Sequence, residues 1–430
     1  MISREEYLKF TKDTHEERIA WFREARFGMF IHYGLFSQEG MGEWVLVQQN
    51  MDEKTNEEFA KSFSPKENCV EEWVKLAYES GAKYCVMTTR HHEGFSLWNS
   101  KVNPYNSYNY CGRDLVREFV VACRKYNLRI GLYSSIMDWH HPDGWKCATD
   151  EESRKRFVKY IEDLNTELLS NYGKIDILWY DMPWPLDHSD KWDSVNRNYK
   201  MRQLQPGLLI NNRSKMPEDF FTPEESLNPE NTDADWEACM TFNRISWGYI
   251  DEKQAEAYNY TSQQIIRILV TCTKNRGNLL LNIGPSGDGS IPSNDKEQIL
   301  KVGKWLKENG EAIYGLKNKS VSVGGNNVTA AVSTVDCKTV YLFNYIWPSN
   351  GKLVIGGYAN APTSVKYVKN NQSIDFEYED GRIILKNLPE KSIDDIMGIA
   401  VIKMEFPEPF KYYYGYHYPQ VHGGIPYDIK

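Results

Sequence analysis

One local theme recurs through the first three hundred residues and constrains the fold more than any other feature. An amphipathic helix is followed by a Gly or Asn that ends it, and then by a short apolar strand. Val70, Trp73 and Ala77 fall on one face of such a helix. Gly81 ends this helix, and residues 84–89 follow as a strand. Strands that alternate with helices in this way predict a parallel sheet covered by helices.

Two of the predicted helices carry recognisable starts. Asn68 with Glu71 three residues later is typical of a capping box, and Asp114 is typical of an N-cap. The predicted strands cover residues 29–35, 84–89, 130–134, 175–180, 208–212 and 279–283. The number of helix and strand units favours a (β/α)8-like barrel, a fold that takes about 250 residues. Residues 220–248 fit the pattern poorly, so we interpret them as irregular loops around an active site.

The pattern changes after Tyr314, where helical periodicity ends and short alternating runs begin. Asp380 and Gly381 lie between two such runs and indicate a two-residue β-hairpin. The fold predicted for the chain is therefore an α/β barrel followed by a C-terminal antiparallel β-sandwich. The predicted domains are a catalytic barrel at residues 1–314, a β-sandwich at 315–406 and a tyrosine-rich tail at 407–430. We expect the tail to pack on its own surface, with a sugar platform or an arm within a homo-oligomer as alternatives.

The overall charge excludes one class of partner. A formal net charge of −8 argues against nucleic acid, because phosphate binding needs a positive surface. The sequence has no run of about 18 apolar residues, so we expect no membrane span. The first residues have no apolar signal core, which predicts a cytoplasmic protein, or a periplasmic or secreted one if a signal was removed. The eight cysteines form no C-x-x-C pair, which argues against a zinc ribbon or a redox motif.

The ends of the predicted strands carry polar groups and indoles. In a β/α barrel the catalytic groups lie at the C-terminal ends of the strands, so these residues should meet at one mouth. They are His32, Glu43, Trp44, Arg90, His91, His92, Glu93, Tyr133, Asp138, Trp139, His140, His141, Trp179, Tyr180, Asp181, Asn212 and Arg213. A sugar presents hydroxyls around its ring edge and apolar C–H faces above and below. The sequence therefore predicts a carbohydrate pocket, and an aromatic content of 13% agrees with it.

Histidines at strand ends also have to be weighed as metal ligands. Five of the nine histidines lie there, namely His32, His91, His92, His140 and His141. No H-x-H or H-E-x-x-H spacing occurs, and adjacent residues on extended backbone point to opposite sides. This arrangement suits two separate hydrogen bonds better than one ion. We expect no metal and no cofactor, and a metal-dependent barrel hydrolase is kept as an alternative.

Asp181 is the strongest single candidate for catalysis. It ends the apolar run Ile-Asp-Ile-Leu-Trp-Tyr, so a rigid strand should hold it at the floor of the pocket. A capping Asp would be the ordinary interpretation, but Trp179 beside it favours a catalytic carboxylate. A retaining glycosidase needs a second carboxylate about 5–5.5 Å away. The candidates for that second group are Glu43, Glu224, Glu225 and Glu237.

Several longer motifs together carry a family resemblance. They are WFREARFGMFIHYGLFS, GEW, AKYCVMTTRHHEGFSLW, GLYSSIMDWHHPD, IDILWYDMPWP, WEACMTFNRISWGY and GNLLLNIGPSGDG. In this order, from about Trp21 to Tyr314, they resemble the α-L-fucosidases of glycoside hydrolase family 29. The resemblance implies a β/α barrel with a C-terminal β-sandwich. It also implies metal-free, retaining hydrolysis of terminal α-L-fucose through a covalent glycosyl-enzyme.

Residue by residue, the resemblance implies a complete site. Asp181 matches the Asp of the family's L-W-x-D motif, which implies that it is the nucleophile. Glu224 in the T-P-E stretch is the implied acid/base. The position of the acid/base varies in this family, so Glu225 and Glu237 stay as alternatives. The residues implied to bind fucose are His32, Glu43, Trp44, His91, His92, Tyr133, Trp179, Arg213 and Trp247.

We therefore predict an exo-acting retaining glycosidase that removes terminal α-L-fucosyl residues. Its partner would be a fucosylated oligosaccharide or glycoconjugate. A barrel that binds fucosylated glycans without cleaving them is the alternative from another class. The sequence does not specify the linkage or the remainder of the glycan.

Overall fold

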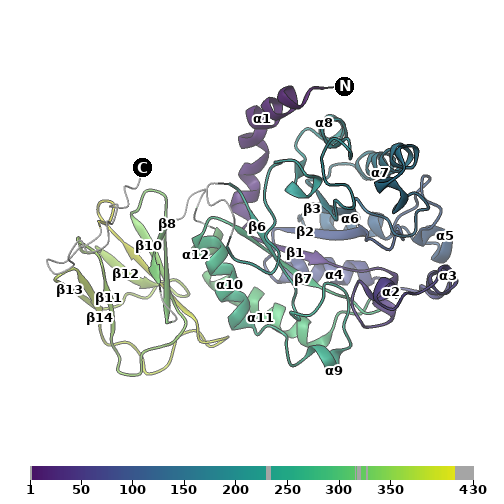
Figure 1. The fold of residues 1–430 in the computed structure, drawn as a ribbon. Coiled ribbons are helices and arrows are strands. Elements are labelled where there is room, and N and C mark those ends of the chain that lie inside the picture. Colours follow the sequence, from purple (N-terminus) through teal and green to yellow (C-terminus); the bar gives the residue numbers. More distant parts are fainter. Residues whose placement is uncertain (1, 229–233, 315, 317–320, 326–327, 412–430) are drawn as a thin grey trace. The chain divides into compact units, whose positions relative to one another are not determined.

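The computed structural model describes residues 2–228, 234–314, 316, 321–325 and 328–411. The chain divides into two compact units, Met1–Lys307 and Glu308–Lys430 (Figure 1). Most of the tyrosine-rich tail, residues 412–430, lies outside the described residues.

The first unit is built on a curled parallel sheet of seven strands (Figure 1). The strands are β1 (Phe27–Ile31), β2 (Tyr84–Arg90), β3 (Arg129–Ser135), β4 (Ile177–Asp181), β5 (Leu209–Ile210), β6 (Glu237–Met240) and β7 (Asn278–Ile283). Their order across the sheet is β5-β4-β3-β2-β1-β7-β6. All strand residues except Arg129 and Asp181 are buried, as expected for a parallel sheet covered on both faces. The predicted parallel α/β architecture is confirmed.

An irregular eighth segment, residues 219–225, lies between the two edge strands. On the β5 side, the Asn212 amide donates to the Phe220 carbonyl at 3.1 Å. On the β6 side, the Glu237 amide donates to the Phe221 carbonyl at 2.9 Å. We call residues 219–225 the closing segment, because it connects the edges of the sheet into a barrel.

The interpretation of residues 220–248 as loops is therefore wrong in part. This stretch contains both β6 and most of the closing segment. β6 has only four residues and begins with Glu237, so it lacks the apolar run that marks the other strands. Its extended form comes from pairing with β7, which is a long-range contact.

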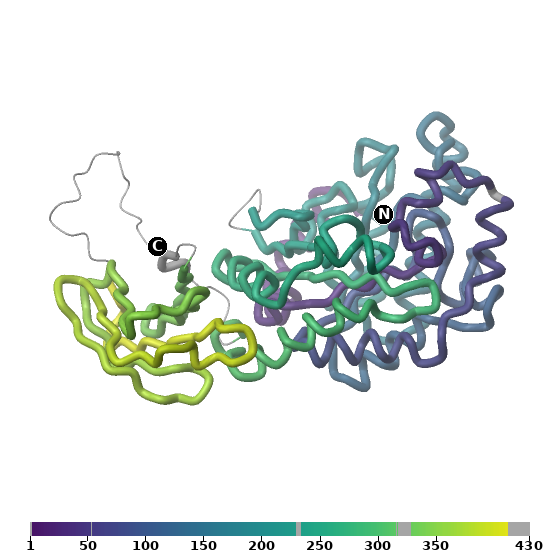
Figure 2. Tube along the Cα trace, turned by 90° about the horizontal axis from the view of Figure 1, so that it is seen from below, coloured from purple at the N-terminus to yellow at the C-terminus, as the bar shows by residue number. Residues whose placement is uncertain are grey.

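Helices surround this sheet, as the ribbon and the trace both show (Figures 1 and 2). They are α1 (Arg4–Ala25), α2 (Val45–Gln48), α3 (Glu53–Ser62), α4 (Cys69–Glu79), α5 (Ser107–Cys111), α6 (Leu115–Lys125), α7 (Glu151–Asn171), α8 (Ser194–Leu204), α9 (Glu252–Ala255), α10 (Ser262–Lys274) and α11 (Ser293–Asn309). Short 3-10 turns occur at η1 (Leu35–Gln38), η2 (Lys146–Ala148) and η3 (Asn212–Ser214). Among the described residues, no helix combines the length and the apolarity that a bilayer crossing requires.

One predicted helix cap is confirmed and one is wrong. Asp114 accepts from the Arg117 amide at 2.8 Å and caps α6. Asn68 adopts the left-handed conformation with φ 63° and makes no side-chain cap to α4. An asparagine tolerates positive φ better than most residues, so Asn68 allows the backbone to turn before α4 but does not cap the helix.

The second unit contains α12 (Glu311–Tyr314) and two antiparallel sheets. Its strands are β8 (Val321–Gly325), β9 (Thr329–Ser333), β10 (Thr339–Asn344), β11 (Leu353–Gly356), β12 (Ser364–Tyr367), β13 (Phe376–Glu379), β14 (Arg382–Leu385) and β15 (Ala400–Glu405). The sheet orders are β12-β15-β10-β9-β8 and β11-β14-β13. The predicted hairpin joins β13 to β14, with Asp380 at φ 48° and Gly381 at φ 71°, as a type I′ turn requires.

Candidate active site

The carboxyl ends of the barrel strands surround a pocket of about 180 Å³. Its lining residues are Phe30, His32, Glu43, Trp44, His91, His92, Tyr133, Trp179, Asp181, Met182, Arg213, Glu224, Cys239 and Trp247. Asp181, Glu224 and all nine of the residues that the sequence suggested for fucose binding are among them. The tertiary structure thus brings eleven residues from positions 32 to 247 to one place.

The strand pleat explains how single strands contribute more than one group. Trp179 and Asp181 are two residues apart on β4, so their side chains lie on the same face, toward the barrel interior. Phe30 and His32 have the same spacing at the end of β1. A rigid strand therefore holds an aromatic ring below each polar group.

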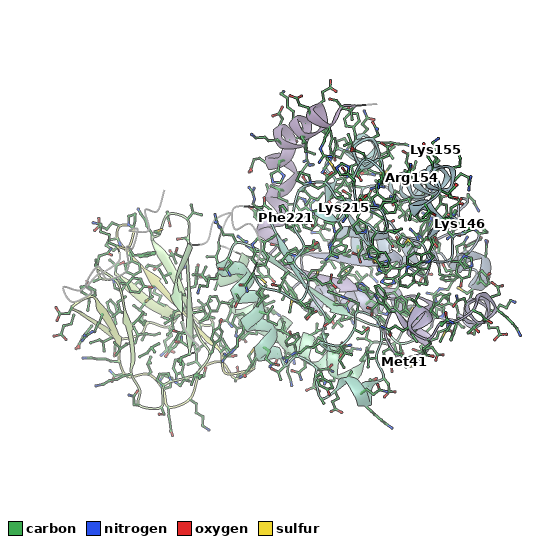
Figure 3. The ribbon with its side chains drawn as sticks, viewed as in Figure 1. Met41, Lys146, Arg154, Lys155, Lys215 and Phe221 are labelled. Carbon is green, nitrogen blue, oxygen red and sulfur yellow. The ribbon has the colours of Figure 1, made fainter. Side chains whose placement is uncertain are left out.

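Asp181 and Glu224 are connected by one guanidinium. Arg213 donates from Nη1 to Asp181 Oδ1 and from Nη2 to Glu224 Oε2, each at 2.9 Å. A guanidinium is a rigid planar fork, so Arg213 holds both carboxylates at one side of the pocket. Lys215 and Phe221, labelled in Figure 3, belong to the loop that leads from Arg213 to Glu224.

The two carboxylates differ in their surroundings. The Asp181 side chain is 20% exposed and also accepts from the Tyr133 hydroxyl at 2.9 Å. Burial and the nearby Asp181 charge raise the pKa of Tyr133, which keeps its hydroxyl protonated as a donor. The Glu224 side chain is 45% exposed and accepts from Trp247 Nε1 at 3.0 Å. Asp181 is thus held at the pocket floor, while Glu224 lies at the solvent side.

The hydrogen bonds of His32 define its tautomer. Asn282 donates through Nδ2 to the Trp247 carbonyl at 2.7 Å, so its Oδ1 is the atom 2.7 Å from His32 Nδ1. His32 Nδ1 therefore carries the proton. Burial, with His91 beside it, holds the pKa of His32 well below its ordinary value. His32 is neutral, and its Nε2 can accept a hydrogen bond from a ligand hydroxyl.

His92 is also a neutral imidazole with its proton on Nδ1. Ser135 Oγ donates to the Met137 carbonyl at 2.6 Å and accepts from His92 Nδ1 at 2.7 Å. Burial is the main cause that holds the pKa of His92 well below its ordinary value. His92 Nε2 lies 3.8 Å from Asp181 Oδ2, and both atoms are acceptors. A hydroxyl placed between them would have an acceptor on either side.

Glu43 and two indoles form the remaining wall. Glu43 Oε2 accepts from the Ser246 hydroxyl and from the Gly248 amide, the latter at 2.8 Å. Trp44 packs edge-on against His92 with ring centroids 5.8 Å apart. Trp247 covers His32 with centroids 5.2 Å apart. The pocket therefore combines fixed acceptors with apolar ring faces, which is the composition of a small-ligand site.

The structure separates the alternative carboxylates from the pocket. Glu225 follows Glu224 on the closing segment and does not line the pocket; its Oε1 accepts from the Thr241 amide at 2.5 Å. Glu237 is fully buried below the floor, where it accepts from Trp179 Nε1 at 3.0 Å and from the Tyr84 hydroxyl. Neither carboxylate reaches the space in which a ligand would sit.

Three lining residues were missed by sequence reasoning, namely Phe30, Met182 and Cys239. Phe30 could have been found from its two-residue spacing to His32, and Met182 from its position after Asp181. Cys239 could not, because β6 was not predicted as a strand.

Glu237 should make stability depend on pH. Burial raises the pKa of Glu237 from an ordinary value of 4.5 to about 7. The folded state therefore binds this proton more tightly, so the stabilisation is present below pH 4.5 and is lost as the pH rises through 7. The shift corresponds to about 3 kcal/mol. Glu237→Gln keeps a side-chain acceptor for Trp179 and should gain stability over the wild type at pH 8 but not at pH 4. Thermal unfolding at both pH values measures this difference, and parallel curves would contradict it.

Comparison with known proteins identifies the family of the chain. The model of the family described as Alpha-L-fucosidase matches residues 2–311. The chain belongs to this family. It is an α-L-fucosidase.

Relatives from several organisms are similar over most of their length. Human tissue alpha-L-fucosidase is 35% identical over 363 residues, which cover 78% of this chain and 77% of the relative. Alpha-L-fucosidase isoenzyme 1 from Paenibacillus thiaminolyticus is 31% identical with a TM-score of 0.82, covering 91% of this chain and 99% of that one. The Thermotoga maritima alpha-fucosidase in complex with a mechanism based inhibitor is 26% identical with a TM-score of 0.74, covering 94% and 99%. The barrel and sandwich of this α-L-fucosidase are therefore those of its relatives.

Proposed function

We propose that Asp181 is the nucleophile and Glu224 the acid/base of this α-L-fucosidase. The observation that carries the assignment is the bridge of Arg213, which holds both carboxylates at the pocket through one guanidinium. Asp181 sits on the rigid end of β4, as an attacking group should. Glu224 is more exposed, as suits a group that exchanges protons with the leaving group and with water.

The first step forms the glycosyl-enzyme. An Asp181 carboxylate oxygen attacks the anomeric carbon of fucose from one face, and the bond from that carbon to the aglycone oxygen breaks. Protonated Glu224 transfers its proton to this leaving oxygen. The fucosyl group is then an ester of Asp181.

The second step releases fucose. Water attacks the anomeric carbon from the face that the aglycone left, Glu224 takes up the water proton, and the ester bond to Asp181 breaks. Two inversions give net retention. The mechanism-based inhibitor held by the Thermotoga maritima relative supports a covalent route.

Neutral acceptors and ring faces would select fucose over other sugars. His32 and His92 each present an unprotonated Nε2 toward the pocket, and Glu43 adds a carboxylate. The aromatic wall contributed by Phe30 and Trp247 suits the methyl group that fucose carries in place of a hydroxymethyl group. These residues keep the substrate in place while Asp181 and Glu224 react.

The anomer released first tests the proposed mechanism. Hydrolysis of 4-nitrophenyl α-L-fucoside should give α-L-fucose before mutarotation, as followed by proton NMR within the first minutes. Immediate appearance of the β anomer would mean inversion. It would remove Asp181 as a covalent nucleophile.

Turnover should not depend on a divalent metal. The reaction proposed here uses only the carboxylates of Asp181 and Glu224 and a water molecule. Among the residues that the structure describes, the carboxylates spaced like metal ligands are Glu308, Asp394 and Asp395, in the second unit. We expect the rate of 4-nitrophenol release to be unchanged within experimental error after dialysis against EDTA. A loss that added Zn²⁺ or Mn²⁺ restores would favour the metal-dependent hydrolase instead.

A further inference from the structure

His91 is the third histidine of the pocket, and a different kind of group stands behind it. His32 and His92 each have a neutral acceptor at Nδ1, which is Asn282 Oδ1 for the first and Ser135 Oγ for the second. The His91 ring lies beside both of them, with its centroid 4.0 Å from that of His92 and 5.9 Å from that of His32. The orientation of His91 therefore shapes the same part of the pocket.

The group behind His91 is the carboxylate of Glu93. Glu93 Oε2 lies 3.4 Å from His91 Nδ1, and both side chains are only 3% exposed. His91 lines the pocket, whereas Glu93 does not. Within the described part of the chain, His91 Nδ1 and the two Glu93 oxygens are shielded from solvent and have no hydrogen-bond partner.

Close packing restricts the Glu93 carboxylate. A Cβ atom on Gly34 would lie 2.5 Å from Glu93 Oε1, which is closer than real Cβ contacts come. Gly34 has an extended backbone with φ −178°, so the restriction at this position is steric and not conformational. Phe36, two residues further on, packs edge-on against the His91 ring with centroids 5.3 Å apart. The loop after β1 thus packs against both members of the pair.

Hydrogen-bond accounting indicates where the proton lies. A buried polar group without a partner is costly, so nearly all such groups in folded proteins are paired. An ionised carboxylate can only accept, so a hydrogen bond between the two groups requires the proton on His91 Nδ1. Nε2, on the other side of the ring, is then the nitrogen left to contact a ligand.

We propose that Glu93 is a positioning residue of this enzyme, which accepts the Nδ1 proton of His91 and thereby directs His91 Nε2 into the pocket. Glu93 does for His91 what Asn282 and Ser135 do for the other two histidines. The inference rests on the proposed function, because the fucosyl ring is the ligand that the three Nε2 atoms contact. Glu93 does not line the pocket, so it acts only through His91.

Glu93→Leu and Glu93→Gln test this role at nearly constant side-chain volume. Leucine has no acceptor for His91 Nδ1, whereas glutamine keeps an amide oxygen there. Glu93→Leu should lower kcat/KM on 4-nitrophenyl α-L-fucoside about ten- to hundredfold, mainly through KM, as the loss of a charged hydrogen bond does. The inhibition constant of free L-fucose should rise by a similar factor. Glu93→Gln should lose much less, and equal losses in both variants would contradict the proposal.

Thermal stability separates positioning from a structural role. Glu93→Leu removes a buried charge that has no hydrogen bond to any described residue, so it should not lower Tm. Asp143 is a matched control, because it is 8% exposed, lies outside the pocket and accepts from Arg156 at 2.7 and 2.9 Å. Asp143→Leu should lower Tm and leave kcat/KM unchanged. A lower Tm with unchanged kcat/KM in Glu93→Leu would make Glu93 a structural residue and overturn the proposal.

The histidine ring nitrogens give the most direct measurement. Nitrogen-15 NMR of enzyme labelled at histidine distinguishes a protonated Nδ1 from a protonated Nε2, and His91→Gln assigns the His91 signals. At neutral pH and without substrate, we expect a protonated Nδ1 in the wild type and its loss in Glu93→Leu. A wild-type His91 protonated at Nε2 alone would overturn the proposal. A protonated Nδ1 that persists in Glu93→Leu would do the same.

These outcomes are distinct from those of the proposed function. The histidine signals come from the free enzyme and need no turnover. An enzyme with the expected His91 signals that turns over no fucoside would contradict the roles of Asp181 and Glu224, and not that of Glu93. Fucoside turnover with wild-type kinetics in Glu93→Leu would contradict the role of Glu93 alone.

Discussion

Asp181→Ala is expected to lose about 10,000-fold or more in kcat on 4-nitrophenyl α-L-fucoside, as removal of a covalent nucleophile does. Without this carboxylate no covalent fucosyl-enzyme can form. Arg213 would keep its hydrogen bonds to Glu224 and Thr222, so the pocket should stay assembled. Release of 4-nitrophenol at saturating substrate measures the loss.

Chemical rescue distinguishes a lost nucleophile from a damaged pocket. Azide can occupy the space left by the Asp181 side chain and attack the anomeric carbon from that side. The product would be β-L-fucosyl azide, with inverted configuration. Asp187→Ala is a matched control, because Asp187 lies six residues further on with a 79% exposed side chain that pairs with Lys191. Near-wild-type turnover in Asp181→Ala would remove Asp181 from the mechanism.

Glu224→Ala is expected to lose about 100- to 10,000-fold on fucosylated oligosaccharides, the usual contribution of a general acid/base. The leaving sugar oxygen needs a proton, whereas 4-nitrophenolate and fluoride leave without one. The first step should therefore survive for 4-nitrophenyl α-L-fucoside and α-L-fucosyl fluoride. Steady-state kinetics on an oligosaccharide and on both activated substrates measure the contrast.

Azide again gives a diagnostic product, now of the opposite configuration. In Glu224→Ala it would attack the Asp181 ester from the face that water normally uses and yield α-L-fucosyl azide. Glu225→Ala is the matched control, since Glu225 is the next residue and does not line the pocket. If Glu225→Ala lost activity and was rescued by azide while Glu224→Ala was not affected, the acid/base would be Glu225 instead of Glu224.

Most of the barrel could be predicted from local pattern. Residues 84–89 and 130–134 are apolar runs, and they form β2 and β3 almost as predicted. A buried parallel strand can be recognised in the sequence as an apolar run, because both of its faces are covered. The polar groups at the ends of such strands were found in the same way, since strand direction brings them to one mouth.

Elements that depend on distant partners could not be predicted in this way. β6 is short and begins with a charged residue, and the closing segment contains Thr222 and Pro223. Their extended backbone is stabilised by hydrogen bonds to strands elsewhere in the chain.

By itself, the sequence determined the α/β barrel, the following β-sandwich, the fucosidase family and a set of eleven pocket residues. It left three glutamates, Glu224, Glu225 and Glu237, competing for one role. Only the tertiary structure gives each of them a different position. Glu224 accepts a hydrogen bond from Arg213, Glu225 accepts one from the Thr241 amide, and Glu237 accepts one from Trp179 below the pocket floor. The physical reason is that hydrophobic periodicity is a local property of the chain. Which carboxylate shares a cation with Asp181, by contrast, depends on contacts between residues 11 and 32 positions apart.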